Sequence, residues 1–236
     1  MASPAINPCY VVKANRLEKA AKINAVLEDF LGRPMQGMRL LDVGVGTGEM
    51  IDFFAIHNQT DGVDVEDQRV SKISAFNLVT DEQLPFADKT FDVVISNHVI
   101  EHVLSPERHL EEINRVLKPG GTVYLATPNR LFPKETHFKL WLIHYLPGPI
   151  YFSLAKKFGR RGDRFWIFTP RSLARLTTMG GFCFKDYTAL ILANPARFHA
   201  KAVCPIGIGK ILGHALSWIS PTFIQVLQRD GEQLKS

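Results

Sequence analysis

The 236-residue sequence contains few cysteines and no repeats. Its three cysteines, Cys9, Cys183 and Cys204, are far apart and lack metal-ligand spacing, which argues against a disulfide scaffold or a zinc knuckle. Internal repeats and low-complexity tracts are also absent. Because the N-terminus lacks a basic segment followed by an apolar one, we expect no secretory signal and a cytoplasmic location. With 46% hydrophobic residues, the chain can nevertheless bury a sizeable core.

Acidic and basic residues are distributed unevenly along the chain. Residues 1–130 contain 13 Lys and Arg against 18 Asp and Glu, whereas residues 131–236 contain 15 against 5. The net charges of the two parts are therefore −5 and +10. A basic, apolar and aromatic appendage on an acidic core indicates a phosphorylated, nucleic-acid or membrane-surface partner. Ordinary solvated lysines and arginines are the alternative interpretation.

Apolar runs alternate with amphipathic segments through the first half of the chain. Helices are expected over residues 16–31, with Asn15 as the N-cap, and from Ser105–Pro106 to Leu117. The expected strands cover residues 39–43, 60–65, 76–80, 91–96 and 122–127. This alternation predicts an α/β fold with a doubly wound, Rossmann-like, mostly parallel sheet and helices on both faces.

The second half of the sequence does not continue this alternation of apolar runs and amphipathic segments. We therefore expect the whole chain to consist of four parts. Residues 1–128 form the core, and residues 129–168 form an aromatic, basic, helical insertion that acts as a lid. Residues 169–195 add one more helix, starting at Thr169–Pro170, and one or two edge strands over 182–193. Residues 196–236 form a helical tail, with an amphipathic helix over 208–219.

A glycine-rich segment follows the first expected strand. Asp42 is followed by Gly44, Gly46 and Gly48, which gives the pattern acid-x-G-x-G-x-G. Glycines at alternate positions allow a sharp turn and let the backbone approach a ligand closely. The pattern indicates a nucleotide-type site at the carboxyl end of the strand. A dinucleotide fingerprint, G-x-G-x-x-G, would place its third glycine where Glu49 stands, which disfavours NAD.

Asp64 lies at the tip of the second expected strand, 20 residues after Gly44. A carboxylate at this point of a nucleotide-binding α/β fold can accept hydrogen bonds from both ribose hydroxyls. The two features together favour a cofactor that contains a ribose.

Three further segments resemble the methyltransferase type 11 family of class I S-adenosylmethionine (SAM) dependent methyltransferases. They are residues 81–94 (DEQLPFADKTFDVV), residues 97–103 (NHVIEHV) and residues 115–121 (RVLKPGG). The resemblance covers residues 38–128 and implies a seven-stranded sheet, SAM as cofactor and S-adenosylhomocysteine as product. It also implies these cofactor-binding residues: Asp42, Gly44, Val45, Gly46 and Gly48 in the glycine loop, Asp64 and Val65 at the ribose, Asp81 and Glu82 at the adenine, and Asn97 at the methionine part. In the family, the acid that binds the adenine usually occupies the position of Thr80 in this sequence. Asp81, the candidate here, lies one residue later.

Two histidines follow the fourth expected strand and are the candidate catalytic residues. His98 comes directly after the strand, and His102 lies one helical turn further. Glu101 is expected to project away from His98. No metal is expected, although residues 98–102 match the H-x-x-E-H zinc signature. A metal site like that of small-RNA 2′-O-methyltransferases, with His137 as a further ligand, is a second alternative.

The sequence therefore predicts a SAM-dependent methyltransferase. Its predicted acceptor is a small molecule, a lipid-linked molecule or a glycan, and the basic, aromatic segment 129–168 suits a membrane surface. Two alternatives stay open at this point. One is an RNA 2′-O-methyltransferase-like enzyme whose basic half binds phosphates, and the other is a SAM-binding regulator without catalytic activity.

Overall fold

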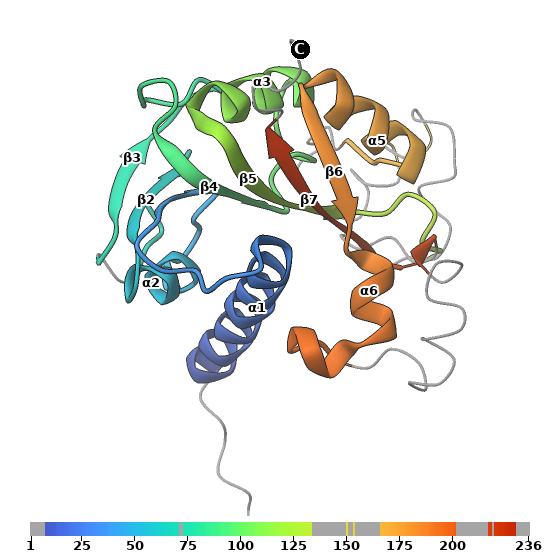
Figure 1. Cartoon of the computed structure of the whole chain (residues 1–236), viewed down its shortest axis with the longest axis horizontal. Helices are drawn as coiled ribbons and strands as arrows, with labels where there is room; N and C mark the ends of the chain where they lie inside the picture. Colours follow the sequence, from blue (N-terminus) through green and yellow to red (C-terminus); the bar gives the residue numbers. More distant parts are fainter. Residues whose placement is uncertain are drawn as a thin grey trace, which may run out of the picture.

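The computed structural model describes residues 8–70, 73–133, 150, 153, 166–201, 217–218 and 220–229. These residues form a seven-stranded sheet with helices on both faces (Figure 1). The strands are β1 (Arg39–Val43), β2 (Gln59–Asp64), β3 (Ala75–Leu78), β4 (Phe91–Asn97), β5 (Leu117–Pro128), β6 (Phe182–Asp186) and β7 (Thr222–Arg229).

The strand order is β3-β2-β1-β4-β5-β7-β6. Strands β1 to β5 run parallel to one another, and β7 runs antiparallel to both of its neighbours, β5 and β6. The predicted doubly wound, mostly parallel α/β sheet is confirmed. Because the carboxyl ends of β1, β2 and β4 meet at one edge, the loops that follow these strands are brought together there.

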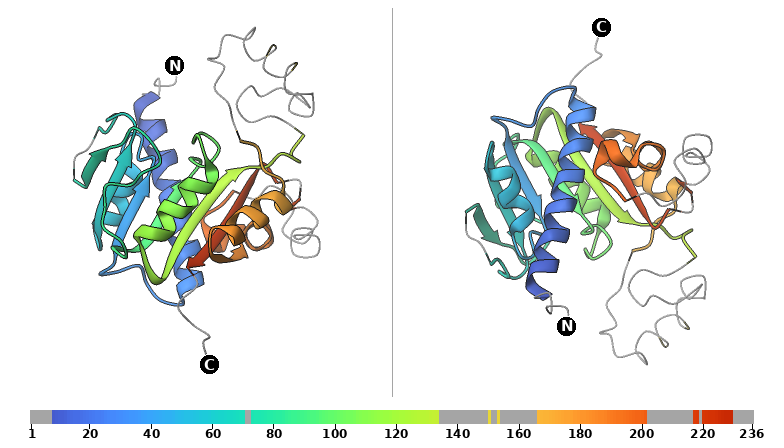
Figure 2. Two further views of the ribbon diagram at one scale, coloured as in Figure 1. Left: turned by 90° about the horizontal axis from the view of Figure 1, so that it is seen from above. Right: turned by 90° about the horizontal axis from the view of Figure 1, so that it is seen from below.

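Two helical layers cover the sheet, as the two views of Figure 2 show. Helices α1 (Pro8–Leu31), α2 (Glu49–Ala55) and α6 (Thr188–Ala193) and the 3-10 helix η2 (Pro195–Phe198) pack on one face. Helices α3 (Pro106–Val116) and α5 (Pro170–Met179) pack on the other. The central strands bury apolar side chains on both faces, which explains their continuous apolar runs.

The helix starts expected at Ser105 and Thr169 are confirmed by their caps. The Ser105 hydroxyl accepts a hydrogen bond from Arg108 N at 3.3 Å, and Pro106 occupies the first turn. Thr169 and Ser172 cap α5 reciprocally, with Pro170 as the first helical residue. Both caps satisfy backbone N–H groups that have no partner within the helix.

Three elements differ from the sequence-based expectations. The first helix begins at Pro8 rather than at residue 16. Residues 188–193 form helix α6 instead of an edge strand, because Asp186 Oδ1 accepts a hydrogen bond from Thr188 N at 2.7 Å and turns the chain into the helix. Residues 222–229 form strand β7 inside the sheet instead of part of a helical tail, because both of their faces are buried.

The two ends of the expected insertion lie side by side. Asn129 and Phe168 form an isolated parallel bridge, and Arg130 N donates to the Phe168 carbonyl at 2.9 Å. Most of residues 129–168, and the amphipathic helix expected over 208–219 apart from residues 217–218, lie outside the described residues. In the part of the chain that the structure describes, no helix is both long and apolar enough to span a membrane.

Candidate active site

A cavity of about 380 Å³ lies at the carboxyl ends of β1, β2 and β4. Its volume falls in the range of about 300–1,000 Å³ that is typical of small-molecule sites. The lining residues come from six chain segments: Val43 and Gly44, Val63 to Val65, Val79 to Glu82 with Leu84, His98 and Val99, His102 to Leu104, and His109. Seven of the predicted site residues are among them: Gly44, Asp64, Val65, Asp81, Glu82, His98 and His102.

Gly44 lies where the chain leaves β1 and enters the loop. Its φ is +78°, and a Cβ atom at this position would lie 2.5 Å from Val99 Cγ2. A side chain would therefore strain the backbone and collide with a residue that lines the cavity. The glycine keeps the loop after β1 in contact with the turn after β4.

Asp64 connects the end of β2 to the glycine loop. Its Oδ2 atom accepts a hydrogen bond from Gly46 N at 2.8 Å, and its Oδ1 atom accepts one from Val65 N at 2.7 Å. A carboxylate oxygen can accept more than one hydrogen bond, so Asp64 can hold the loop and still bind a hydroxyl group. This geometry is compatible with the predicted ribose contact.

Asp42, near the end of β1, is completely buried, and neither of its carboxylate oxygens has a hydrogen-bond partner among the described residues. Burial, followed by the negative charge of Asp64, raises the pKa of Asp42 to about 8, although Arg16 acts in the opposite direction. A buried carboxylate without a partner is costly, and a cationic ligand would compensate it. SAM carries a sulfonium and an ammonium group, so this orphaned acid fits the predicted cofactor.

The two acids that follow β3 are held in different ways. Asp81 is exposed, and its Oδ1 atom accepts a hydrogen bond from Gln83 N at 2.9 Å. Glu82 Oε1 accepts hydrogen bonds from Leu104 N at 2.6 Å and Ser105 N at 3.2 Å, so it connects this loop to the start of α3. Thr80, which occupies the position of the family acid, also lines the cavity.

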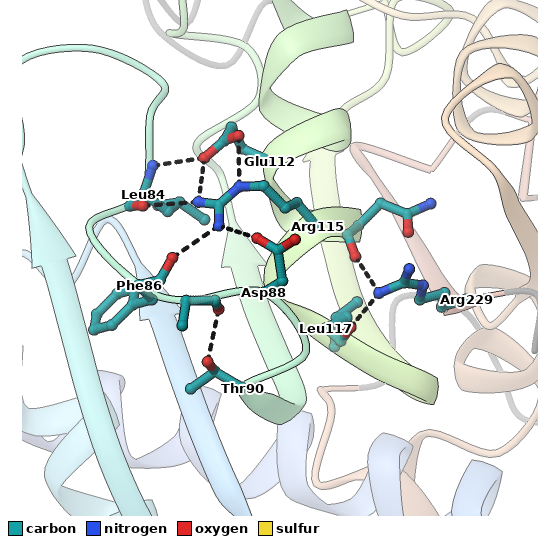
Figure 3. Close-up of polar contacts among 10 residues, drawn as sticks. Leu84, Phe86, Asp88, Thr90, Glu112, Arg115, Leu117 and Arg229 are labelled. Carbon is teal, nitrogen blue, oxygen red and sulfur yellow. Dashed lines mark hydrogen bonds and ion pairs between the residues drawn. The ribbon is translucent and has the colours of Figure 1, made fainter.

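An arginine on α3 holds this loop through several hydrogen bonds (Figure 3). The Arg115 guanidinium donates to the Leu84 carbonyl at 2.9 Å, to the Phe86 carbonyl at 2.8 Å and to Asp88 Oδ1 at 2.8 Å. Glu112 accepts from both Arg115 and Leu84 N, each within 2.9 Å. The R-V-L-K-P-G-G motif therefore supports the L-P-F segment and holds one wall of the cavity.

The other predicted cofactor-binding residues do not line the cavity. Asp42 and Val45 are buried, and Gly48 N donates to the Val45 carbonyl. Gly46 N donates to Asp64 and Asn97 precedes His98, so each of these two lies next to a residue that lines the cavity. Their roles at the cofactor stay predictions.

His98 forms a hydrogen-bonded chain with Glu101 and Thr127. His98 Nδ1 lies 3.1 Å from Glu101 Oε1, and the Thr127 hydroxyl donates to Glu101 Oε2 at 3.1 Å. The Glu101 side chain is 1% exposed and that of His98 is 40% exposed. His98 has a φ of +61°. The chain therefore runs from a buried carboxylate to an imidazole that is accessible from the cavity.

This contact corrects the expectation that Glu101 projects away from His98. Residues 99–102 form a turn in which His102 N donates to the Val99 carbonyl at 2.8 Å. A buried carboxylate needs partners, and His98 and Thr127 are the side chains that supply them. His102 lines the same cavity.

His109 is a cavity residue that the sequence did not suggest. It projects from α3, and its Nε2 atom lies 3.0 Å from the Ser96 hydroxyl. Burial lowers the pKa of His109 to about 4, despite the charges of Glu82 and Glu101, so the ring is neutral at pH 7. In the sequence, the one indication of this role is that His109 is a titratable residue within the apolar stripe of the expected helix.

In the described part of the chain, no group of three or more His, Cys, Asp or Glu residues is arranged to hold a metal ion. His137, the further ligand of the alternative metal site, lies outside the described residues.

A protein-family model described as a methyltransferase domain matches residues 15–182. The chain belongs to this family. It is 30% identical over 194 residues to an uncharacterized methyltransferase of Mycolicibacterium vanbaalenii. That alignment covers 78% of this chain and 74% of the relative. It is 34% identical over 109 residues to a ubiquinone biosynthesis O-methyltransferase of Rhizobium rhizogenes. That match spans 42% of this chain and less than half, 44%, of the relative.

Solved structures share the fold of this methyltransferase domain. A SAM-dependent methyltransferase from Mesorhizobium loti superposes with a TM-score of 0.55 at 15% identity, covering 83% of this chain and 92% of its own. Haemonchus contortus phosphoethanolamine N-methyltransferase 2 superposes with a TM-score of 0.56 at 18% identity, and the alignment covers 89% of this chain and 52% of that one. The sheet order is thus that of the class I SAM-dependent methyltransferases, and the family resemblance inferred from the motifs is confirmed.

Proposed function

We propose that this protein transfers the methyl group of SAM to a small-molecule acceptor, with the cofactor in the cavity at the ends of β1, β2 and β4. The observation that carries this proposal is Asp42, a buried carboxylate that has no hydrogen-bond partner among the described residues and directly precedes Val43 and Gly44, which line the cavity. Such a group favours a ligand with positive charge. After methyl transfer the sulfonium charge is lost, so Asp42 also favours the substrate SAM over the product S-adenosylhomocysteine.

Several of the proposed cofactor contacts line the cavity. Asp64 and Val65 bind the ribose, and Asp81 and Glu82 lie at the adenine end, where their loop forms one wall. The glycine loop from Gly44 onward and Asn97 lie at the methionine end. When bound, SAM supplies an activated methyl group on a good leaving group, so positioning of the acceptor provides much of the rate acceleration.

His98 is the proposed general base. A new bond forms between an acceptor oxygen or nitrogen and the methyl carbon, and the carbon–sulfur bond breaks with its electron pair moving to sulfur. The proton of the acceptor moves to His98 Nε2. Glu101 and Thr127 are positioning residues: Glu101 accepts the Nδ1 hydrogen and thereby leaves Nε2 free to accept the proton.

The names of related proteins favour a small acceptor. They include a ubiquinone biosynthesis O-methyltransferase, a phosphoethanolamine N-methyltransferase and a 1,6-didemethyltoxoflavin N1-methyltransferase. The last has a TM-score of 0.53 at 16% identity, and the alignment covers 97% of this chain and 93% of that one. The acceptors that we propose also include lipid-linked molecules and glycans.

Radiolabelled SAM incubated with separated extracts of small metabolites, quinones, lipids, glycans and RNA tests the proposal. We expect label in one of the first four fractions. Label in RNA alone would favour the RNA-methyltransferase interpretation. Saturable SAM binding without label in any fraction would favour a regulator.

Replacement of Asp64 by alanine should weaken SAM binding by roughly 1–3 kcal/mol, the loss expected for buried hydrogen bonds to a charged group. The loss has two sources, because Asp64 also holds Gly46 N. Isothermal titration calorimetry measures the effect. The matched control is Glu66→Ala, which removes an exposed acid two residues along the chain that does not line the cavity. Equal SAM affinity in both variants would contradict the proposed role of Asp64.

A further inference from the structure

A second cavity, of about 300 Å³, lies between α1, η2 and the start of β7. Among the residues that the structure describes, it shares none of its lining with the proposed cofactor cavity. Its walls are formed by residues 18–22 of α1, residues 188–201 around α6 and η2, and residues 220–224 at the start of β7. The two cavities are therefore separate sites on one domain.

Positive charge is concentrated around this second cavity. Lys19, Lys22 and Lys201 line it, and Glu18 is the single acid among its described lining residues. Glu18 Oε2 lies 3.7 Å from Lys201 Nζ, so that acid already has a cationic partner. Within the residues that the structure describes, Lys19 and Lys22 form no ion pair.

Lys22 lies partly buried in the wall of the cavity. Burial, followed by the like charge of Lys19, lowers the pKa of Lys22. An ammonium group in such a place is destabilised unless an anion compensates it. The lining also contains Thr222 and His199, whose hydroxyl and imidazole groups can donate hydrogen bonds to the same anion. The Ser220 hydroxyl instead donates to the Thr222 carbonyl at 3.1 Å.

The cavity lies close to the edge of the sheet that carries the cofactor site. Arg16 lies one helical turn before Lys19, and its guanidinium approaches the glycine loop. A Cβ atom added to Gly46 would lie 3.4 Å from this guanidinium. On the other wall, Asn129 Nδ2 at the end of β5 donates to the Trp218 and Ser220 carbonyls, each at 2.8 Å. Both walls thus lie next to residues at the carboxyl ends of the strands.

We propose that this second cavity binds an oxyanion, the phosphate or carboxylate group of a small molecule, with Lys22 and Lys19 as its charged donors. Charge-assisted hydrogen bonds from two ammonium groups supply the affinity, and the neighbouring Thr222 hydroxyl and His199 imidazole orient the oxyanion. The site is a binding site in addition to the cofactor cavity and does not depend on the methyl-transfer reaction.

Titration of the full chain with inorganic phosphate and, separately, with acetate tests the proposal, with chloride used to keep the ionic strength constant. We expect saturable one-to-one binding of at least one of the two anions. Lys22→Gln should weaken it roughly tenfold or more, as for a lost charge-assisted hydrogen bond, whereas Lys22→Arg should retain it. Phosphate-only or acetate-only binding identifies which oxyanion the site prefers.

The control variant is Lys89→Gln, which makes the same charge change just before β4, at the opposite edge of the sheet. It should leave anion binding unchanged. Lys22→Gln removes a destabilised charge and should melt no lower than the wild type in anion-free buffer, and Lys19→Gln at an exposed position provides a second test. The proposal is overturned if neither anion binds saturably, or if both lysine variants bind as tightly as the wild type.

Discussion

Loss of the His98 imidazole should lower kcat by roughly 10²- to 10⁴-fold, the usual contribution of a general base. SAM affinity should change little, because the imidazole acts on the acceptor. Asparagine is the appropriate replacement, since it tolerates the positive φ of +61° at this position and cannot accept the proton at pH 7. Measurement of kcat and of the SAM dissociation constant on His98→Asn separates catalysis from binding.

A second replacement distinguishes catalysis from a structural role of His98. His98→Gly fits the same backbone conformation without strain and leaves space for a free imidazole molecule. We expect added imidazole to restore part of the lost activity, which it would not do for a residue that only packs. The control is His57→Asn, at an exposed histidine at the opposite edge of the sheet, where Gly37 N donates to its carbonyl. No loss of kcat in His98→Asn would refute the assignment.

Glu101→Gln tests the positioning role in the same assay. The amide can no longer accept from the imidazole as a buried anion does, so kcat should fall while the protein still binds SAM. Because Glu101 also accepts from the Thr127 hydroxyl, Thr127→Val should produce a smaller loss of the same kind. A change confined to thermal stability would make Glu101 a structural residue only.

Replacement of Asp42 by asparagine should have opposite effects on SAM binding and on the stability of the ligand-free protein. The pKa of Asp42 is raised from 3.8 to about 8 in the folded protein, so between these values the folded state binds more protons than the unfolded state. The free energy of unfolding of the wild type therefore decreases as the pH rises from about 4 to about 8, by up to about 1.4 kcal/mol per pH unit from this group. Asp42→Asn removes this decrease and should be the more stable protein above pH 8.

The same substitution should weaken SAM binding by roughly 10- to 100-fold, the cost of losing a charge-assisted interaction in a buried site. Below pH 8, SAM binding to the wild type should release a proton from Asp42, and binding to Asp42→Asn should not. Calorimetric titration in two buffers with different ionisation enthalpies measures the released proton. Equal proton release in the two proteins would show that Asp42 stays protonated in the complex.

The local parts of the fold and of the site could be predicted from the sequence. The glycine loop and Asp64 are short-range patterns with a direct structural reason, and the structure places Gly44 and Asp64 at one cavity. The contact between His98 and Glu101 was missed, because it depends on a tight turn and on the burial of Glu101 under residues far along the chain. His109 was missed because its meaning depends on Ser96 across the helix–sheet interface.

Strand β7 shows why the rest was not predictable. Its apolar residues would suit either a helix or a strand, and its partners are β5, about a hundred residues earlier, and β6. Residues 222–229 form a strand because they pair with β5 on one side and with β6 on the other. Pairing with strands this far away in the sequence does not show in a local sequence pattern.

The central place of β7 also determines when the sheet can be completed during synthesis. Strand β6 leaves the ribosome before β7 but has no direct partner in β5, so it cannot join the sheet until residues 222–229 have emerged. Until then β5 presents an open edge of unpaired N–H and carbonyl groups, a known template for aggregation. In the nascent chain, the edge of β5 therefore stays unpaired until β7 has been made.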